Sequence, residues 1–178
     1  MSSYRNNAHI RLLVSTAMLI TMASILHIIE GMLPPIPVTG ARLGLANIIT
    51  VAAIVMFGPK TAFSVAAGRT ILGSLFSTGI VSPGFAMSFS GAMLSWAVMA
   101  LLYFLAKDSF SLVGLSLVGA IAHNLAQLFV ASLILENIGT FALFPFLMIF
   151  AIPTGIMVGL AAGFLIRAMA RVPNFKRR

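Results

Sequence analysis

Long apolar runs, separated by short polar or proline- and glycine-containing breaks, cover almost the whole chain. A helix needs about 20 apolar residues to cross a bilayer core that is about 30 Å thick. The runs therefore predict six membrane-spanning helices, at about 10–32, 44–58, 60–78, 84–106, 110–135 and 143–170. The second run is short. Because the six helices use most of the chain, we expect one domain over 1–178, an all-α integral membrane protein built as a six-transmembrane-helix bundle.

The composition excludes several classes of function. Of the 178 residues, 60% are hydrophobic and 8% are charged, whereas about a quarter of the residues of a soluble domain are charged. The acidic residues are Glu30, Asp108 and Glu136, too few for the carboxylate clusters of a metal-dependent prenyl synthase or phosphohydrolase. The chain has no Cys and no Walker motif. We therefore expect a membrane protein that is not an enzyme, with no catalytic residue, metal or cofactor.

The positive charges lie mostly at the ends of the apolar runs, and the net charge is +8. On one side of a six-helix topology lie Arg5, Arg11, Lys60, Lys107, Arg167, Arg171, Lys176, Arg177 and Arg178, and on the other Glu30, Arg42 and Glu136. Cytoplasmic loops carry an excess of Lys and Arg, so we expect both termini in the cytoplasm. The basic residues of the C-terminal tail are not interleaved with aromatic side chains. They therefore indicate contact with the lipid bilayer and no nucleic acid.

Three spans carry small residues along one face, where helices can approach closely in lipid. These rows are Gly155, Gly159 and Gly163 with Ala151 in the sixth span, Ala62, Ala66 and Gly73 in the third, and Ala17, Thr21 and Ser24 in the first. Each row fits packing inside the bundle or contact with a membrane partner, and the sequence does not choose between them.

Arg69 is an ionisable residue inside the third span, a position that costs roughly 2.5–3.5 kcal/mol on insertion scales. It lies nine residues after Lys60, which places it near mid-depth at a rise of about 1.5 Å per residue. One interpretation is a structural clamp onto helix ends or onto Glu30. The other is a counter-charge for an anionic ligand group, or a contact with a partner subunit.

The fifth span carries the polar residues His123, Asn124 and Gln127 within five positions. His123 and Gln127 are four apart and share a helix face. This pattern predicts a lined cavity, with hydrogen bonds between helices as the alternative. No carboxylate or thiolate accompanies the three residues, so they do not predict a metal site.

Two weaker polar features lie elsewhere in the spans. His27 and Glu30 are three apart near the outer end of the first span, where they can pair with each other or bind a ligand. Ser88, Gly91 and Ser95 form a mild polar stripe in the fourth span.

The segment 34–48 is the most specific in the chain. Its three prolines cannot continue a helix, and Gly40 and Gly44 allow tight turns. Non-helical backbone at membrane depth is tolerated only where it lines a cavity or is buried in protein. We therefore expect a re-entrant or capping loop that holds Arg42 and Asn47 at the outer mouth. Its backbone N–H groups, Arg42 and the start of the second span would bind an anion there.

These features together resemble the Gx transporter family, whose members are often labelled heptaprenyl diphosphate synthase component I. The resemblance rests on the segment 34–48, the Arg69-x-x-x-Gly73 pattern, Ser82-Pro83-Gly84 and the segment 119–127, and it extends over roughly 10–165. The family is distantly similar to the S components of energy-coupling-factor (ECF) transporters. Those are six-helix membrane proteins that bind a vitamin or related micronutrient from outside, and an ATPase-driven T subunit reorients them.

The resemblance implies a multi-pass protein of the bacterial cytoplasmic membrane, with ECF T and ATPase subunits as partners. The first outer loop and the last three spans would form the pocket, and the first three spans would contact the T subunit. With Arg42 added at the outer mouth, the expected substrate-binding residues are Arg42, Asn47, Arg69, His123, Asn124 and Gln127. Many S components have an alanine pair at the T-subunit contact. The nearest match here is Ala17 with Thr21, and Ser24 lies on the same row.

The leading hypothesis is therefore a substrate-capture subunit of an ECF-type importer, whose ligand has an anionic or strongly hydrogen-bonding end. The alternative is a membrane accessory of isoprenoid or quinone metabolism that holds a prenyl diphosphate beside a soluble synthase. A third hypothesis, a solitary facilitator or ion-coupled transporter, is weaker because the spans lack an acid at mid-depth.

Overall fold

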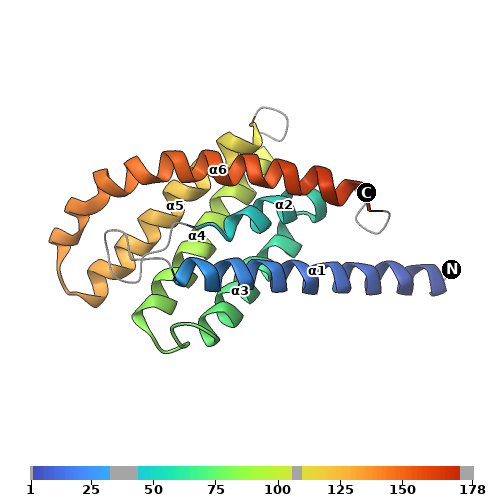
Figure 1. Ribbon diagram of the computed structural model, residues 1–178, viewed down its shortest axis with the longest axis horizontal. Coiled ribbons are helices and arrows are strands. Elements are labelled where there is room, and N and C mark those ends of the chain that lie inside the picture. Colours follow the sequence, from blue (N-terminus) through green and yellow to red (C-terminus); the bar gives the residue numbers. More distant parts are fainter. Residues whose placement is uncertain (1, 33–43, 106–109, 173–178) are drawn as a thin grey trace.

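The computed structural model describes residues 2–32, 44–105 and 110–172 of the chain (Figure 1), with the side chains of the first range described from residue 9 onward. The elements are α1 (Ser2–Gly31), α2 (Asn47–Phe57), α3 (Pro59–Leu75), α4 (Pro83–Leu105), α5 (Leu112–Ile134), the 3₁₀ helix η1 (Ile138–Leu143) and α6 (Phe144–Ala170). Within these ranges there is no strand. The all-helical prediction is confirmed, and each predicted span corresponds to one α-helix.

Local sequence signals set several of the helix ends. Gly58 has φ +89°, a conformation that favours glycine, and Pro59 follows it at the start of α3. The predicted break between the second and third spans is therefore confirmed. Ser111 caps α5, since its hydroxyl accepts a hydrogen bond from the amide of Gly114 at 3.0 Å.

The short helix α2 lies at the centre of the bundle. It packs against each of the other α-helices, and most of its residues are buried. Around it, α1 packs on α3, α3 on α4, α4 on α5 and α5 on α6. In Figure 1, α2 lies between α6 and α1. A helix that is apolar on all sides is suited to such a buried position.

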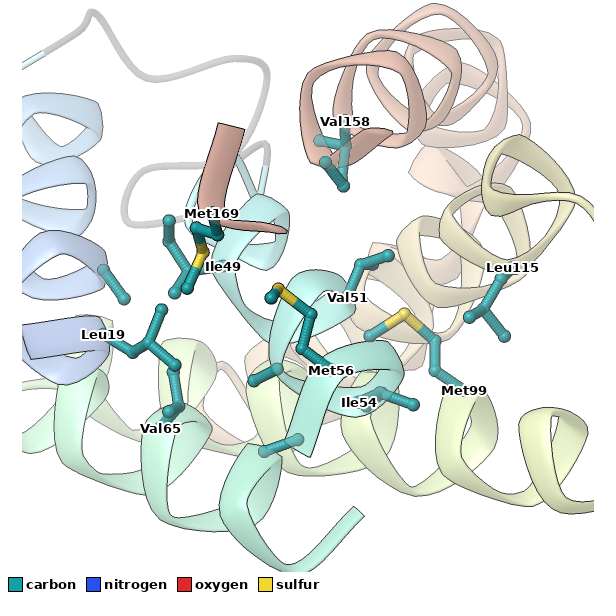
Figure 2. Close-up of a cluster of buried hydrophobic side chains, with 14 residues drawn as sticks. Leu19, Ile49, Val51, Ile54, Met56, Val65, Met99, Leu115, Val158 and Met169 are labelled. Carbon is teal, nitrogen blue, oxygen red and sulfur yellow. The ribbon is translucent and has the colours of Figure 1, made fainter. Parts of the chain in front are cut away.

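The hydrophobic core is built around α2 (Figure 2). From α2 it contains Ile49, Val51, Ile54 and Met56, and from the surrounding helices Leu19, Val65, Met99, Leu115, Val158 and Met169. Because side chains from all the other α-helices hold α2, the core also sets the position of its first residue, Asn47.

The outer face of the bundle is apolar, whereas polar side chains are buried within it. Leu13 of α1, Phe129 of α5 and Phe164 of α6 are all more than half exposed. Soluble proteins rarely expose large contiguous apolar surfaces. The distribution is that of a helical bundle surrounded by lipid.

Four helical stretches are long and apolar enough to cross a membrane: His9–Gly31, Pro83–Leu105, Leu112–Ile134 and Ile138–Ala170. The 11 residues of α2 rise about 16 Å, which is less than the bilayer core. α3 has 17 residues. The structure thus has six helices and four clear membrane spans, and six complete crossings stay a prediction.

The start of α1 and the end of α6 lie at the same end of the molecule (Figure 1). If successive helices run in opposite directions and their number is even, the first helix begins and the last helix ends on the same side, as they do here. Which end faces the cytoplasm stays a prediction of the charge distribution.

The glycine row of α6 packs inside the bundle. A Cβ atom added to Gly155 would lie 2.8 Å from Cα of Leu117, and one added to Gly159 would lie 2.6 Å from Cα of Val113. These glycines therefore bring the backbones of α5 and α6 into close contact, and Ala151 is fully buried nearby on the same row.

The other two rows differ from each other. Ala62 and Ala66 of α3 are fully buried, and Gly73 leaves room for the ring of His27, so this row is also internal. In α1, Ser24 is buried, whereas Ala17 and Thr21 are exposed. A partner contact at Ala17 and Thr21 therefore remains a prediction, and Ser24 faces the bundle.

Candidate functional site

Buried polar side chains from five helices meet beside the start of α2. We call this group the polar layer: Glu30 of α1, Asn47 of α2, Arg69 of α3, Ser95 of α4, and His123 and Gln127 of α5. Each is no more than 5% exposed. Burying such groups is costly unless they are hydrogen-bonded, so their contacts define what the layer can do.

Arg69 is joined to two other helices through Asn47. Its Nη2 donates to Oδ1 of Asn47 at 2.7 Å, and Nδ2 of Asn47 donates to Oγ of Ser95 at 3.3 Å. Arg69 is only 1% exposed. A buried guanidinium therefore has a neutral amide as one of its acceptors, at the first residue of α2.

Glu30 holds the backbone just before α2. Its Oε1 accepts hydrogen bonds from the amide of Gly44 and, at 3.3 Å, from the amide of Leu45. Gly44 has φ +84°, so the turn that presents these amides favours glycine. The carboxylate of α1 thus clamps the start of α2, where negative charge is stabilised by the helix dipole.

His123 and Gln127 form a hydrogen-bonded pair on the face of α5 toward α4 and α2. The amide nitrogen of Gln127 lies 2.8 Å from Nε2 of His123, which accepts because an amide nitrogen only donates. The ring lies against Gly91 of α4, where an added Cβ would be 2.9 Å from Cε1. It also lies beside Gly44, so the imidazole meets the same turn that Glu30 holds.

Asn124 faces a different neighbour. Its Nδ2 donates to the backbone carbonyl of Leu147 in α6 at 3.2 Å. Ser116, two turns earlier, donates in the same way to the carbonyl of Gly155 at 2.5 Å. These two residues join α5 to α6, which is the alternative that the sequence left open for this polar group.

His27 lies outside the polar layer, between α1 and α3. Its ring packs on Gly73, and Nε2 is 3.4 Å from Oγ of Ser74. His27 and Glu30, which sequence reasoning considered as a pair, therefore face different helices: His27 faces α3, and Glu30 faces the start of α2.

The structure brings together four of the six expected substrate-binding residues: Asn47, Arg69, His123 and Gln127. Asn124 is turned toward α6, and Arg42 lies outside the described residues. The expected loop 34–48 is described only from residue 44, where a turn leads into α2. None of these placements tests a binding role, which stays a prediction.

Glu30 and Ser95 are residues of the layer that are not among the six expected substrate-binding residues. In the sequence, Ser95 was one position of a mild polar stripe, and Glu30 was an acid that could pair with His27, bind a ligand or meet Arg69. Among the described residues, no group of three or more His, Cys, Asp or Glu is placed to hold a metal ion.

The layer combines one guanidinium, one carboxylate, one imidazole, two amides and a hydroxyl. Such a set suits the binding of a small polar molecule with an acceptor end for Arg69 and a donor or acceptor end for His123 and Gln127. Ionisable residues inside a membrane span commonly serve a function.

The fold and this layer together define a helical integral membrane protein with a polar site inside its bundle. Over residues 19–165 the sequence matches the family described as heptaprenyl diphosphate synthase component I. The match covers most of the chain, so the protein belongs to this family, which is the one its motifs indicated. Neither the comparison with curated proteins nor the comparison with solved structures gives a match.

Proposed function

We propose that the protein is a membrane substrate-binding subunit, similar to an S component, of an ECF-type importer. It captures a small, micronutrient-like molecule from outside the cell. The ligand carries an anionic or strongly hydrogen-bonding end. The observation that carries the proposal is the polar layer, which gathers side chains of five helices beside the start of α2.

The chemistry of the layer supports a binding role. A buried charge is retained in an apolar bundle at considerable cost, and structural packing alone does not need Glu30, Arg69 and His123 at one place. Arg69 supplies the donor for an anionic group. His123 and Gln127 of α5 supply hydrogen bonds for the rest of the ligand.

In this proposal the protein is not an enzyme and does not supply the energy for transport. The sequence has no nucleotide-binding motif, so an ATPase and a T subunit would drive reorientation. The exposed pair Ala17 and Thr21 of α1 is the proposed contact with the T subunit. The proposed location is the bacterial cytoplasmic membrane.

The test compares three variants of α5 purified in mild detergent from the native host. We expect His123→Ala and Gln127→Ala each to retain about a tenth of the wild-type amount of co-purified small molecule, because each loses a hydrogen bond in a buried site. The amount per protein is measured by mass spectrometry of the extracted ligand.

Ser116→Ala is the matched control, since Ser116 lies on the same helix but donates to the carbonyl of Gly155 in α6. We expect it to retain the ligand and to lose about 1 kcal/mol of stability from the missing interhelical hydrogen bond. Wild-type ligand content in both the His123 and the Gln127 variants would refute the assignment of the pocket.

A second function is favoured by the description of the family, which refers to a component of heptaprenyl diphosphate synthase. In that case the protein is a membrane accessory that holds a prenyl diphosphate beside a soluble synthase. Arg69 would meet the diphosphate and the apolar bundle would meet the tail. A lipidic ligand, together with a co-purifying synthase and no ATPase, distinguishes this function from the importer.

A further inference from the structure

We propose that Asn47 is a placeholder for the ligand: its side-chain oxygen occupies on Arg69 the position that an oxyanion of the ligand takes when it binds. This inference rests on the proposed function and makes it more specific. It assigns the binding of the ligand's anionic group to Arg69. Asn47 then competes with the ligand for Arg69 and is not itself a ligand contact.

The first step is the nature of the bond between Arg69 and Asn47. A guanidinium has five N–H donors in a planar fork that matches a carboxylate or phosphate. In the structure its Nη2 donates to the neutral amide oxygen of Asn47, at 2.7 Å. An ionised oxyanion forms stronger, frequently bidentate hydrogen bonds with the same fork. A ligand oxyanion is therefore the better acceptor for this donor.

The second step is that oxygen atoms of the protein itself accept hydrogen bonds from the donors of the layer. Asn47 accepts from Arg69, and Glu30 accepts from the amides of Gly44 and Leu45. All of these side chains are buried. A ligand thus enters by exchange, in which one internal acceptor leaves its donor as the ligand takes its place.

The third step is that Asn47 is the acceptor that can leave. Its other side-chain bond, to Ser95, is long at 3.3 Å and neutral. Glu30, by contrast, is charged, and it accepts from two backbone amides. When the ligand takes the place of the leaving side chain, that side chain is a neutral amide at Asn47 but a carboxylate at Glu30, which is more costly to leave buried without its donors. Exchange at Arg69 is therefore the less costly step.

The position of Asn47 couples this exchange to the fold. Asn47 is the first residue of α2, the helix around which the hydrophobic core is built. When an oxyanion displaces its side chain, α2 loses its link to α3 at this point. Ligand binding therefore changes the contacts at the start of the central helix, next to the turn that Glu30 and His123 contact.

The experiment measures the binding of inorganic pyrophosphate to the purified wild-type protein and to Asn47 variants by isothermal titration calorimetry. A direct ligand contact predicts weaker binding for Asn47→Ala. A placeholder predicts the opposite, about tenfold tighter binding, because Asn47 no longer competes with the probe for Nη2 of Arg69. Asn47→Asp places a carboxylate on Arg69 and is expected to bind pyrophosphate at least about tenfold more weakly than wild type.

Two further variants keep the test decisive. Thr50→Val removes a buried hydroxyl one turn further along α2, outside the polar layer, so its affinity is expected to stay within about threefold of wild type. Asn47→Ser retains a small polar side chain at the start of α2, and it replaces Asn47→Ala if that variant does not fold. The folded state of each variant is checked by thermal unfolding in detergent.

The same series with geranyl diphosphate distinguishes the source of the oxyanion. Tightening in Asn47→Ala for pyrophosphate supports exchange with a water-soluble anion, and tightening only for geranyl diphosphate supports exchange with a prenyl-linked headgroup. Unchanged or weaker binding of both probes in Asn47→Ala, or no binding of either probe to any variant, overturns the inference. The importer proposal is decided separately by the ligand content of the His123 and Gln127 variants.

Discussion

Replacement of Arg69 with glutamine is expected to reduce the ligand affinity of the protein by about 100-fold while leaving the bundle folded. The glutamine side chain is two bonds too short to replace the hydrogen bond to Oδ1 of Asn47, but the hydrophobic core around α2 does not include Arg69 and keeps the bundle folded. The positive charge and the planar fork are lost, and charge-assisted hydrogen bonds to an anion contribute about 1.5–3 kcal/mol each in a protein. The measurement is the dissociation constant of the molecule that co-purifies with the wild-type protein.

Two further substitutions accompany this variant. Arg69→Lys keeps the charge but not the fork, and we expect an intermediate loss of about tenfold. Lys60→Gln is the matched control, since Lys60 is the exposed cation at the start of the same helix, and its affinity should equal that of wild type. Wild-type affinity in Arg69→Gln would show that Arg69 is a structural clamp.

Addition of one methyl group at Gly159 is expected to destabilise the bundle by about 2 kcal/mol or more. In Gly159→Ala the new Cβ would lie 2.6 Å from Cα of Val113 and 2.9 Å from the carbonyl oxygen of Leu112. Both atoms belong to the backbone of the first turn of α5. A helix backbone cannot move aside as a side chain would. Overpacking of this kind typically costs about 1–3 kcal/mol. Reversible unfolding in mixed micelles measures the change.

Gly163→Ala is the matched control on the same row of α6. The nearest atom to its new Cβ is the flexible Cδ1 of Leu112, at 3.4 Å, so we expect stability within about 0.5 kcal/mol of wild type. If both variants unfold alike, α5 and α6 do not approach each other closely at Gly159.

The positions of the helices could be predicted from the sequence, because apolar runs and proline or glycine breaks are local signals. The break at Gly58 and Pro59 is one example. The place of α2 could not be predicted in this way. A short apolar run looks the same whether lipid or protein surrounds it, so only the packing shows that α2 is central.

The membership of the polar layer could be predicted in part. Arg69, His123 and Gln127 are conspicuous because polar residues are rare in apolar spans. Their partners were not predictable. His123 and Asn124 are adjacent in sequence, yet successive residues of a helix point about 100° apart, and here one faces α4 and the other α6. The clamp of Glu30 on the start of α2 depends on a turn that no periodic pattern reveals.

Native mass spectrometry of the protein, purified in mild detergent from its own host, tests the central claim most directly. We predict a water-soluble molecule with an anionic group, bound one to one, or co-purifying T and ATPase subunits. A bound prenyl diphosphate or an associated soluble synthase, without any ATPase subunit, would contradict the importer role and favour the accessory function.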